Sequence, residues 1–531
     1  MQADSRKIIS ENIVADRSKL KIICVFLYRI YFGRIPYEGQ YRGKKRKAMN
    51  ITELQQSYAS HPNVEGVCRL LKDNSVRHLY CGGLYASAAS LFSSVLVQRA
   101  TCPLVFILGD MEEAGYFYHD LTQILGTEQV LFFPSSFRRA IKYGQKDAAN
   151  EILRTEVLSR LQKGEEGLCV VTYPDALAEK VVSRKELGDN TLKLHAGERV
   201  DMNFVTDVLR SYGFEYVDYV YEPGQYAVRG SIIDVFSFSS EYPFRIDFFG
   251  DEVESVRTFE VETQLSKEKK ESIVIVPDLS HSLEKKGSGG MVSFLDFLPS
   301  DSLLAMRDFL WLRERIQTVH DESLTPQAIA ARESEENGAI TLEGKLIDGG
   351  EFTLRALDFR RMEFGNKPTG TPDATISFHT TVQPIFHKNF DMVAESFREY
   401  LSRHYTIYIC SDSLKQTDRI RAIFEDRGDN ISFTAVERTL HEGFADDTLR
   451  ICIFTDHQLF DRFHKYNLKS DKARSGKVAL SLKELNQFTP GDYVVHTDHG
   501  VGRFAGLVRI PNGDTTQELS LIHISEPTRP Y

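Results

Sequence analysis

Short apolar runs alternate with a helical pattern between residues 50 and 187. The apolar runs cover residues 104–108, 130–133 and 168–172, and the stretch from Glu112 to Leu125 has the spacing of an amphipathic helix. Short, continuously apolar strands separated by helices are typical of a parallel sheet with helices on its faces. The pattern therefore predicts an α/β module over residues 49–190.

Near Val200 the pattern changes to aromatic, β-rich sequence with turn signals, which predicts a small separate domain over residues 191–275. In the run 244–249, a period of two places Phe244, Ile246 and Phe248 on one face and Arg245, Asp247 and Phe249 on the other. The first face is a predicted core. The second combines Arg with an aromatic side chain, as protein-binding surfaces do. A sheet surface with an incidental Phe and an Arg-Asp pair fits the pattern equally well.

The second half of the chain reads as further α/β sequence followed by a β-rich end. Residues 276–390 are mixed, and the weak periodicity and the Gly and Pro residues of 333–373 predict loops there. Residues 391–466 contain the predicted strands 406–410 and 449–454 around a predicted helix, 414–427. A polar linker, 467–484, precedes a β-rich module that begins near Leu485.

The two ends differ from the rest of the sequence. In residues 1–48 an apolar run is broken by Arg29 and then followed by a basic cluster, an order that fits neither a signal peptide nor a membrane helix. We interpret residues 1–48 as a non-native extension before a start at Met49, with a nucleic-acid patch as the alternative. Residues 519–531 resemble a translated sequencing adapter.

Composition narrows the class of protein. The chain has 531 residues, a hydrophobic fraction of 42% and a net charge of −10, so it predicts a multidomain globular protein rather than a nucleic-acid coat or a membrane protein. The cysteines are scattered, odd in number and form no CxxC pair, which favours buried thiols in a reducing cytoplasm. They are Cys24, Cys68, Cys81, Cys102, Cys169, Cys410 and Cys452.

Three short motifs resemble catalytic or metal sites but lack groups that the chemistry needs. The loop from Cys81 to Ser90 lies where a phosphate loop would, yet it has no Lys to neutralise phosphate. In Thr455-Asp456-His457-Gln458, His457 stands where a helicase DExH box has Glu. His496 and His499 have no third ligand nearby in the sequence. The sequence therefore predicts no catalytic residue and no metal site.

Two longer stretches carry a family resemblance. Residues 229–236 and 245–252 resemble the RG…DIFP…RIEFFGDEIE signature of UvrB, which also occurs in the transcription-repair coupling factor family, whose front end is a UvrB-like module. Residues 488–507 resemble the start of that family's RNA-polymerase-interacting, CarD-like domain. The missing Lys and this second stretch favour the coupling-factor family over UvrB itself.

The resemblance implies an α/β multidomain fold. Its parts would be a degenerate P-loop-type parallel α/β module (UvrB-like) over 49–190 and 276–390, an inserted small α+β UvrA-binding domain over 191–275, a further small α/β domain over 391–466, and a truncated β-rich (CarD-like) module over 485–518.

The resemblance also implies a cytoplasmic adaptor that recruits UvrA and binds RNA polymerase in transcription-coupled nucleotide excision repair. The family's UvrA contacts fall on Arg229, Arg245 and Phe249. The polymerase-facing positions would be Val494, His496, His499, Gly500, Gly502, Arg503 and Phe504. ATP, Mg and firm DNA binding are expected only in the family's motor beyond this sequence, so no cofactor and no enzyme activity are expected here. A UvrB-like ATP-dependent DNA helicase and a CarD-like transcription regulator are the alternatives.

Overall fold

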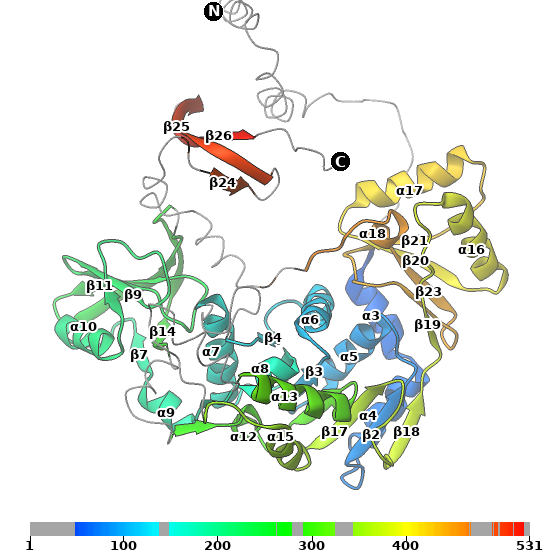
Figure 1. The fold of residues 1–531 in the computed structure, drawn as a ribbon, viewed down its shortest axis with the longest axis horizontal. Coiled ribbons are helices and arrows are strands. Elements are labelled where there is room, and N and C mark those ends of the chain that lie inside the picture. The colour runs from blue at the N-terminus through cyan, green and yellow to red at the C-terminus, as the bar shows by residue number, and fades with distance from the viewer. Residues whose placement is uncertain are drawn as a thin grey trace, which may run out of the picture. The chain divides into compact units, whose positions relative to one another are not determined.

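A computed structural model describes residues 48–136, 148–261, 263–278, 290–323, 344–466, 468, 491, 493–496, 500–512 and 515–524 (Figure 1). In this part of the chain the fold is mixed α/β, with several sheets that contain parallel strands. No helix among the described residues combines the length and the apolar character needed to cross a bilayer.

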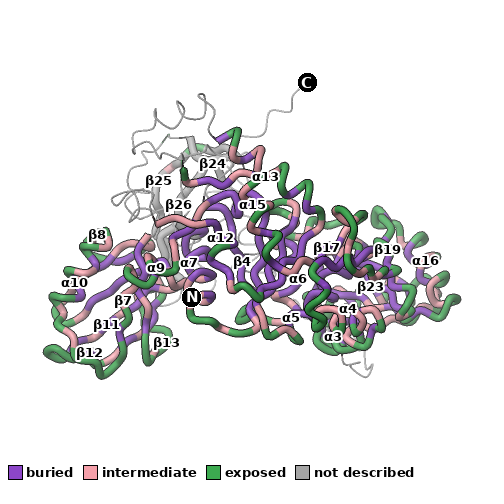
Figure 2. The backbone as a smooth tube through the Cα atoms, turned by 90° about the horizontal axis from the view of Figure 1, so that it is seen from below, coloured by how far each residue is buried: buried purple, intermediate pink, exposed green. Residues whose placement is uncertain are grey.

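The largest sheet has seven strands in the order β18-β2-β17-β16-β3-β5-β4, and every neighbouring pair is parallel. Its inner strands are apolar because helices cover both faces, and residues of β3 and β5 are fully buried (Figure 2). The predicted strands 104–108, 130–133 and 168–172 are thereby confirmed. The strands are β2 (His78–Gly82), β3 (Leu104–Ile107), β4 (Val130–Phe133), β5 (Cys169–Thr172), β16 (Leu303–Met306), β17 (Arg360–Gly365) and β18 (Ala374–Ser377).

Helices surround this sheet, and two short strands, β6 (Val181–Val182) and β15 (Met291–Val292), pair beside it. The predicted helix from Glu112 to Leu125 is confirmed as α6, which Asp110 caps by accepting from the Glu113 amide at 2.9 Å. The helices are α3 (Ile51–Ala59), α4 (Pro62–Leu70), α5 (Ala88–Arg99), α6 (Met111–Leu125), α7 (Ala148–Gln162), α8 (Pro174–Ala178), α9 (Arg184–Asp189), α12 (Phe294–Phe297), α13 (Phe309–Ser323) and α15 (Gly349–Ala356).

The prediction of loops over residues 333–373 is wrong for residues 349–356 and 360–365 and is confirmed for residues 366–373, while residues 333–343 lie outside the described part of the chain. Residues 349–356 form α15 and residues 360–365 form β17, an inner strand of the large sheet. Asp348 starts the helix by accepting from the Glu351 amide at 2.7 Å, and Phe352 is buried in the core. The apolar periodicity is weak because α15 is only eight residues long and buries three of them, Gly349, Phe352 and Ala356.

A second sheet is formed within residues 215–270 in the order β13-β12-β11-β10-β9-β8, and its neighbours are antiparallel except β8 and β9. Helix α10 (Met202–Ser211) packs on one face through Val205 and Leu209. The strands are β8 (Glu215–Tyr216), β9 (Gln225–Arg229), β10 (Ile232–Val235), β11 (Phe244–Phe249), β12 (Glu252–Phe259) and β13 (Ser266–Lys270), and β7 (Leu192–His195) pairs with β14 (Ser272–Ile275) beside it.

A third sheet has the order β1-β21-β20-β23-β22-β19 and mixes parallel with antiparallel pairs. Its Cys410, Val436, Phe444 and Ile453 share one hydrophobic core with the seven-stranded sheet. The elements are β1 (Met49–Asn50), β19 (Thr380–Val382), α16 (Phe390–Ser402), β20 (Thr406–Ser411), α17 (Leu414–Asp426), β21 (Thr434–Glu437), β22 (Phe444–Asp446), β23 (Ile451–Thr455) and α18 (Asp456–Leu459). These bounds confirm the predicted strands and helix of residues 406–454.

Three antiparallel strands lie near the end of the chain: β24 (Tyr493–His496), β25 (Gly500–Asn512) and β26 (Thr515–Ile524). Strand β26 includes part of the segment 519–531 that the sequence assigns to an adapter. Cys81, Cys169, Cys410 and Cys452 are buried, as expected for thiols of core strands, and the six described cysteines are free.

Candidate protein-interaction site

Strand β11 shows the predicted alternation. Phe244, Ile246 and Phe248 are buried with exposed fractions of 7%, 0% and 4%, whereas Phe249 is 80% exposed. This exposed apolar ring is a candidate contact for a partner, because burial of its surface would be favourable. The structure therefore separates a core face from an outer face that carries Phe249.

A buried carboxylate organises the two arginines on this outer face. Asp234 of β10 lies opposite Arg245 of β11, and its side chain is only 1% exposed. Arg245 donates from Nε to Oδ1 at 2.8 Å and from Nη2 to Oδ2 at 2.9 Å, which is a bidentate pair. Arg229 of β9 also donates to Asp234 Oδ2. No local pattern in the sequence indicates this role of Asp234, because only the pairing of β10 with β11 places it beside Arg245.

The arginines also rest on aromatic rings. The Arg245 guanidinium lies 4.5 Å from the centroid of buried Phe259, and the Arg229 guanidinium lies 5.0 Å from that of Tyr219, which is 51% exposed. The hydrogen bond from Arg245 to Asp234 raises the pKa of the guanidinium above its usual value, so Arg245 keeps its positive charge. Arg229, Arg245 and Phe249 thus lie on one face of the sheet, with Tyr219 beside Arg229.

The loop between β2 and α5 is tightly packed against other parts of the chain. Gly83 has a φ of +75°, and a Cβ there would lie 2.0 Å from the carbonyl oxygen of Phe378. Ser87 Oγ donates to Asp120 Oδ2 at 2.7 Å and accepts from the Glu442 amide at 2.9 Å. Asp120 also accepts from the His441 amide at 2.7 Å. Helix α6 and the 438–443 loop therefore use the polar groups that follow this turn.

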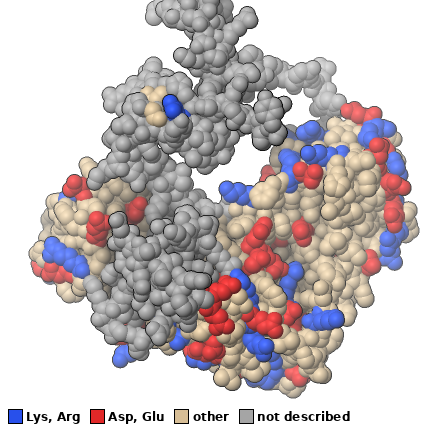
Figure 3. Space-filling model, in the orientation of Figure 1, with Lys and Arg blue, Asp and Glu red and all other residues tan. Residues whose placement is uncertain are grey.

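An open cleft of about 350 Å³ lies beside this loop and is rich in carboxylates. It is lined by Asp110, Glu112, Glu113, Asp120 and Glu442, with Arg307 among them. Arg307 Nε pairs with Glu113 Oε1 at 2.8 Å. Burial raises the pKa of Asp120 to about 7 and raises that of Glu442. Figure 3 shows acidic side chains gathered over α6, so this acidic cleft favours cations over phosphate.

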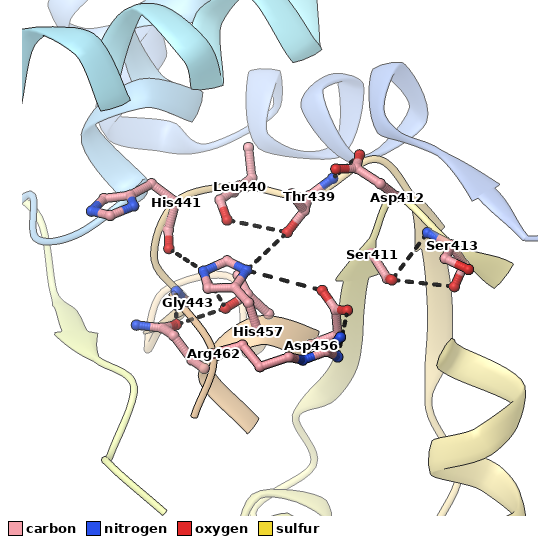
Figure 4. A network of polar contacts seen from close by, with 12 residues as sticks. Ser411, Asp412, Ser413, Thr439, Leu440, His441, Gly443, Asp456, His457 and Arg462 are labelled. Atoms are coloured by element: carbon pink, nitrogen blue, oxygen red, sulfur yellow. Dashed lines mark hydrogen bonds and ion pairs between the residues drawn. The ribbon is translucent and has the colours of Figure 1, made fainter. Parts of the chain in front are cut away.

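The residues of the DExH-like motif are occupied with internal contacts (Figure 4). His457 Nε2 lies 2.7 Å from the carbonyl oxygen of His441, and Arg462 Nη2 lies 3.3 Å from Asp456 Oδ2. Burial lowers the pKa of His457 and raises that of Asp456. The motif ties α18 to the 438–443 loop instead of presenting a carboxylate pair to solvent.

The predicted polymerase-facing residues lie on the final three-stranded sheet. Val494 and His496 belong to β24, and Gly500, Gly502, Arg503 and Phe504 belong to β25. Val494 pairs with Gly502, and His496 pairs with Gly500. Arg503 is exposed. His499 lies outside the described residues.

Comparison with known proteins finds two domain families and one kind of relative. The family model of the UvrB interaction domain matches residues 192–281, and that of the CarD-like/TRCF RID domain matches residues 488–529. Transcription-repair-coupling factors of Staphylococcus aureus (strain bovine RF122 / ET3-1) and Bacillus subtilis (strain 168) are 23% and 21% identical to the chain, over 82% and 85% of its length. These alignments cover 42% and 44% of the relatives, so the chain spans less than half their length. Together, the two domain matches and these relatives support a likeness between the chain and an N-terminal portion of a transcription-repair-coupling factor.

Proposed function

We propose that the chain is an adaptor in transcription-coupled nucleotide excision repair that recruits UvrA through its UvrB interaction domain. The observation that carries the proposal is the outer face of β9 to β11, where Arg229, Arg245 and the 80%-exposed Phe249 lie together within the matched residues 192–281. Arg and exposed aromatic residues are the side chains that most often dominate protein interfaces.

The chemistry of this face fits a protein partner that offers carboxylates and an apolar pocket. A planar guanidinium held by Asp234 is pre-oriented, so binding costs little side-chain entropy. Lys in place of Arg245 would keep the charge but lose the bidentate geometry with Asp234.

A second partner of the proposed adaptor is RNA polymerase. The support is the match of residues 488–529 to the CarD-like/TRCF RID domain, together with the strands β24 to β26 found there. Arg503, exposed on β25, is the contact residue that we propose for testing.

We further propose that the seven-stranded module does not use ATP. The loop at residues 82–90 lacks the Lys of a phosphate loop, and the carboxylates of the acidic cleft would repel a triphosphate at this place. Titration of the chain with a fluorescent ATP analogue in the presence of Mg²⁺ should show no saturable binding. Saturable binding that unlabelled ATP displaces would instead support a helicase-like module.

The adaptor proposal is tested by titrating purified UvrA with the full chain and with its Arg229→Ala, Arg245→Ala, Phe249→Ala triple variant. The proposal expects saturable binding that the triple variant loses while its circular dichroism spectrum stays unchanged. A wild-type chain that does not bind UvrA, or a folded triple variant that binds as tightly, would refute it.

A further inference from the structure

The outer face of the inserted sheet carries a third arginine beyond the two discussed above. Arg257 of β12 lies opposite Arg245 of β11, and Arg245 lies opposite Asp234 of β10. Residues directly opposite each other in an antiparallel sheet point to the same side. Asp247, two residues beyond Arg245, also points there, and it accepts hydrogen bonds from Arg257 Nη2 and, at 2.7 Å, from Ser255 Oγ.

Each of the three arginines therefore pairs with an aspartate on a neighbouring strand. We call the set Arg229, Asp234, Arg245, Asp247 and Arg257 the Arg-Asp lattice. The two carboxylates are largely buried, with exposed fractions of 1% and 14%. They hold the guanidinium groups at defined positions on the sheet surface.

The three arginines differ in their exposure and in how far hydrogen bonds within the chain already use their guanidinium nitrogens. Arg245 is only 14% exposed, and all three of its nitrogens are used, because Nη1 also donates to the Gln264 carbonyl oxygen at 3.1 Å. Arg229 and Arg257 are 36% and 37% exposed. Arg229 and Arg257 therefore present more of their side chains to a partner than Arg245 does.

We infer that Arg229 and Arg257 make the direct contacts with the protein partner, and that Arg245 acts through Asp234 as a positioning residue. The inference rests on the proposed UvrA-binding function and deepens it by adding Arg257 and reassigning Arg245. Arg229 and Arg257 lie on strands β9 and β12, three strand spacings apart, which is roughly 14 Å. Two contacts at that separation require a partner surface with at least two carboxylates.

The partner chemistry is that of an acidic protein surface and not of nucleic acid. Residues 225–270 carry six Lys and Arg against nine Asp and Glu, so this sheet repels a phosphate backbone as a whole. Phe249 lies opposite Glu252 at the end of the same face and supplies an exposed apolar contact. A few guanidinium donors beside one aromatic ring suit a protein hot spot.

The test measures the affinity of the full chain for purified UvrA by isothermal titration calorimetry. Arg257→Ala should weaken binding by about tenfold or more, as Arg229→Ala should, and Arg257→Lys should recover only part of the loss. Arg210→Ala is the matched control, because Arg210 is 67% exposed on α10, which packs on the opposite, core face of the sheet. Circular dichroism of each variant establishes that it is folded.

A double-mutant cycle separates positioning from contact. If Arg245 acts by holding Arg229 through Asp234, the Arg245→Ala and Arg229→Ala losses should fall well short of additive, whereas the Arg229→Ala and Arg257→Ala losses should add. Full additivity of Arg245→Ala with Arg229→Ala would overturn the positioning role. A folded Arg257→Ala variant within twofold of wild type would overturn the contact role and leave the adaptor proposal standing. Absence of wild-type binding would instead remove the proposed function itself.

Discussion

Asp234 is the residue on which the order of the outer face depends most. Its side chain is 1% exposed, and its carboxylate forms ion pairs with the guanidinium groups of Arg229 and Arg245. Replacing it with Asn keeps the shape but removes the negative charge, which leaves Arg245 largely buried without a counter-ion. A buried charge without a counter-ion lowers stability, because it has lost its hydration free energy and gains no ion pair in return.

We predict that Asp234→Asn lowers the free energy of unfolding of the inserted domain by about 1–3 kcal/mol. Urea unfolding followed by circular dichroism measures the change. Asp207→Asn is the control, because Asp207 pairs with Arg210 at 71% exposure and should alter stability by less than about 0.5 kcal/mol. Equal effects of both substitutions would contradict the structural role of Asp234.

Gly83 is the second residue with a sharp expectation. Its positive φ disfavours any side chain, and its missing Cβ makes room for the Phe378 carbonyl oxygen. We predict that Gly83→Ala destabilises the module by roughly 2–4 kcal/mol, which combines backbone strain with a clash against main chain. Gly164→Ala serves as a control, because Gly164, at the end of α7, has a φ of +69° but open space around its Cβ position. It should cost only about 1 kcal/mol, and similar melting temperatures of the two variants would contradict the packing argument.

At the scale of elements, aromatic and histidine rings pack α6, the 438–443 loop, α18 and the segment 462–466 against one another. The ring centroids of Tyr116 and His441 lie 3.5 Å apart, those of His457 and His464 lie 4.3 Å apart, and Tyr116 Oη donates to the His464 carbonyl oxygen at 2.8 Å. Burial lowers the pKa of His119 and His464 to about 4 and that of His441 to about 3. Asp412, Asp456 and Arg462 are the charged groups that act on this cluster.

These pKa shifts predict a loss of stability in acid. Between about pH 6.5 and pH 4 the unfolded chain protonates these histidines while the folded chain does not, so stability falls as the pH falls. Asp120, with its pKa raised to about 7, has the opposite effect, as have Glu442 and Asp456, whose pKa values burial also raises. These three carboxylates stand against four histidines with lowered pKa values, because His457 belongs to the same cluster.

The substitution His441→Phe keeps the stacking on Tyr116 but removes one titrating ring. We predict that it weakens the pH dependence of the free energy of unfolding below pH 6.5. The slope should change by less than about 1.4 kcal/mol per pH unit, the limit for one proton, because His441 is partly exposed and screened. Leu354→Ala, which removes no titrating group from an exposed site, is the control and should leave the slope unchanged. An unchanged slope in His441→Phe would show that the ring does not titrate differently in the folded state.

Elements with strong local signals could be predicted from the sequence, and elements defined by distant partners could not. The apolar strands β3, β4 and β5 and helix α6 matched their predicted ranges within one residue, because each buries a continuous or periodic apolar pattern. Helix α15 was missed, since its eight residues rely on the Asp348 cap and on burial of Phe352. The contacts of Ser87 with Asp120 and Glu442 join positions 33 and 355 residues apart, which no local pattern encodes.

At the scale of the whole molecule, the two proposed partners would bind different parts of the chain. The Arg-Asp lattice lies within residues 192–281, whereas the CarD-like match covers residues 488–529. The loop at 82–90, where the seven-stranded module would hold phosphate, is instead packed by the 438–443 loop of the third sheet. We interpret this module as a scaffold of the proposed adaptor rather than as a nucleotide-binding module.

Separate surfaces predict separable losses of binding. Arg229→Ala with Phe249→Ala should weaken UvrA binding by at least about tenfold and leave RNA polymerase binding within twofold. Arg503→Glu should do the reverse, because it inverts the charge of an exposed residue on β25 while the lattice stays intact. Titration of each purified partner with the variants of the chain measures both affinities in parallel. If either set of substitutions weakened the binding of both partners equally, the two surfaces would be coupled through the scaffold. Independent docking sites would then be ruled out.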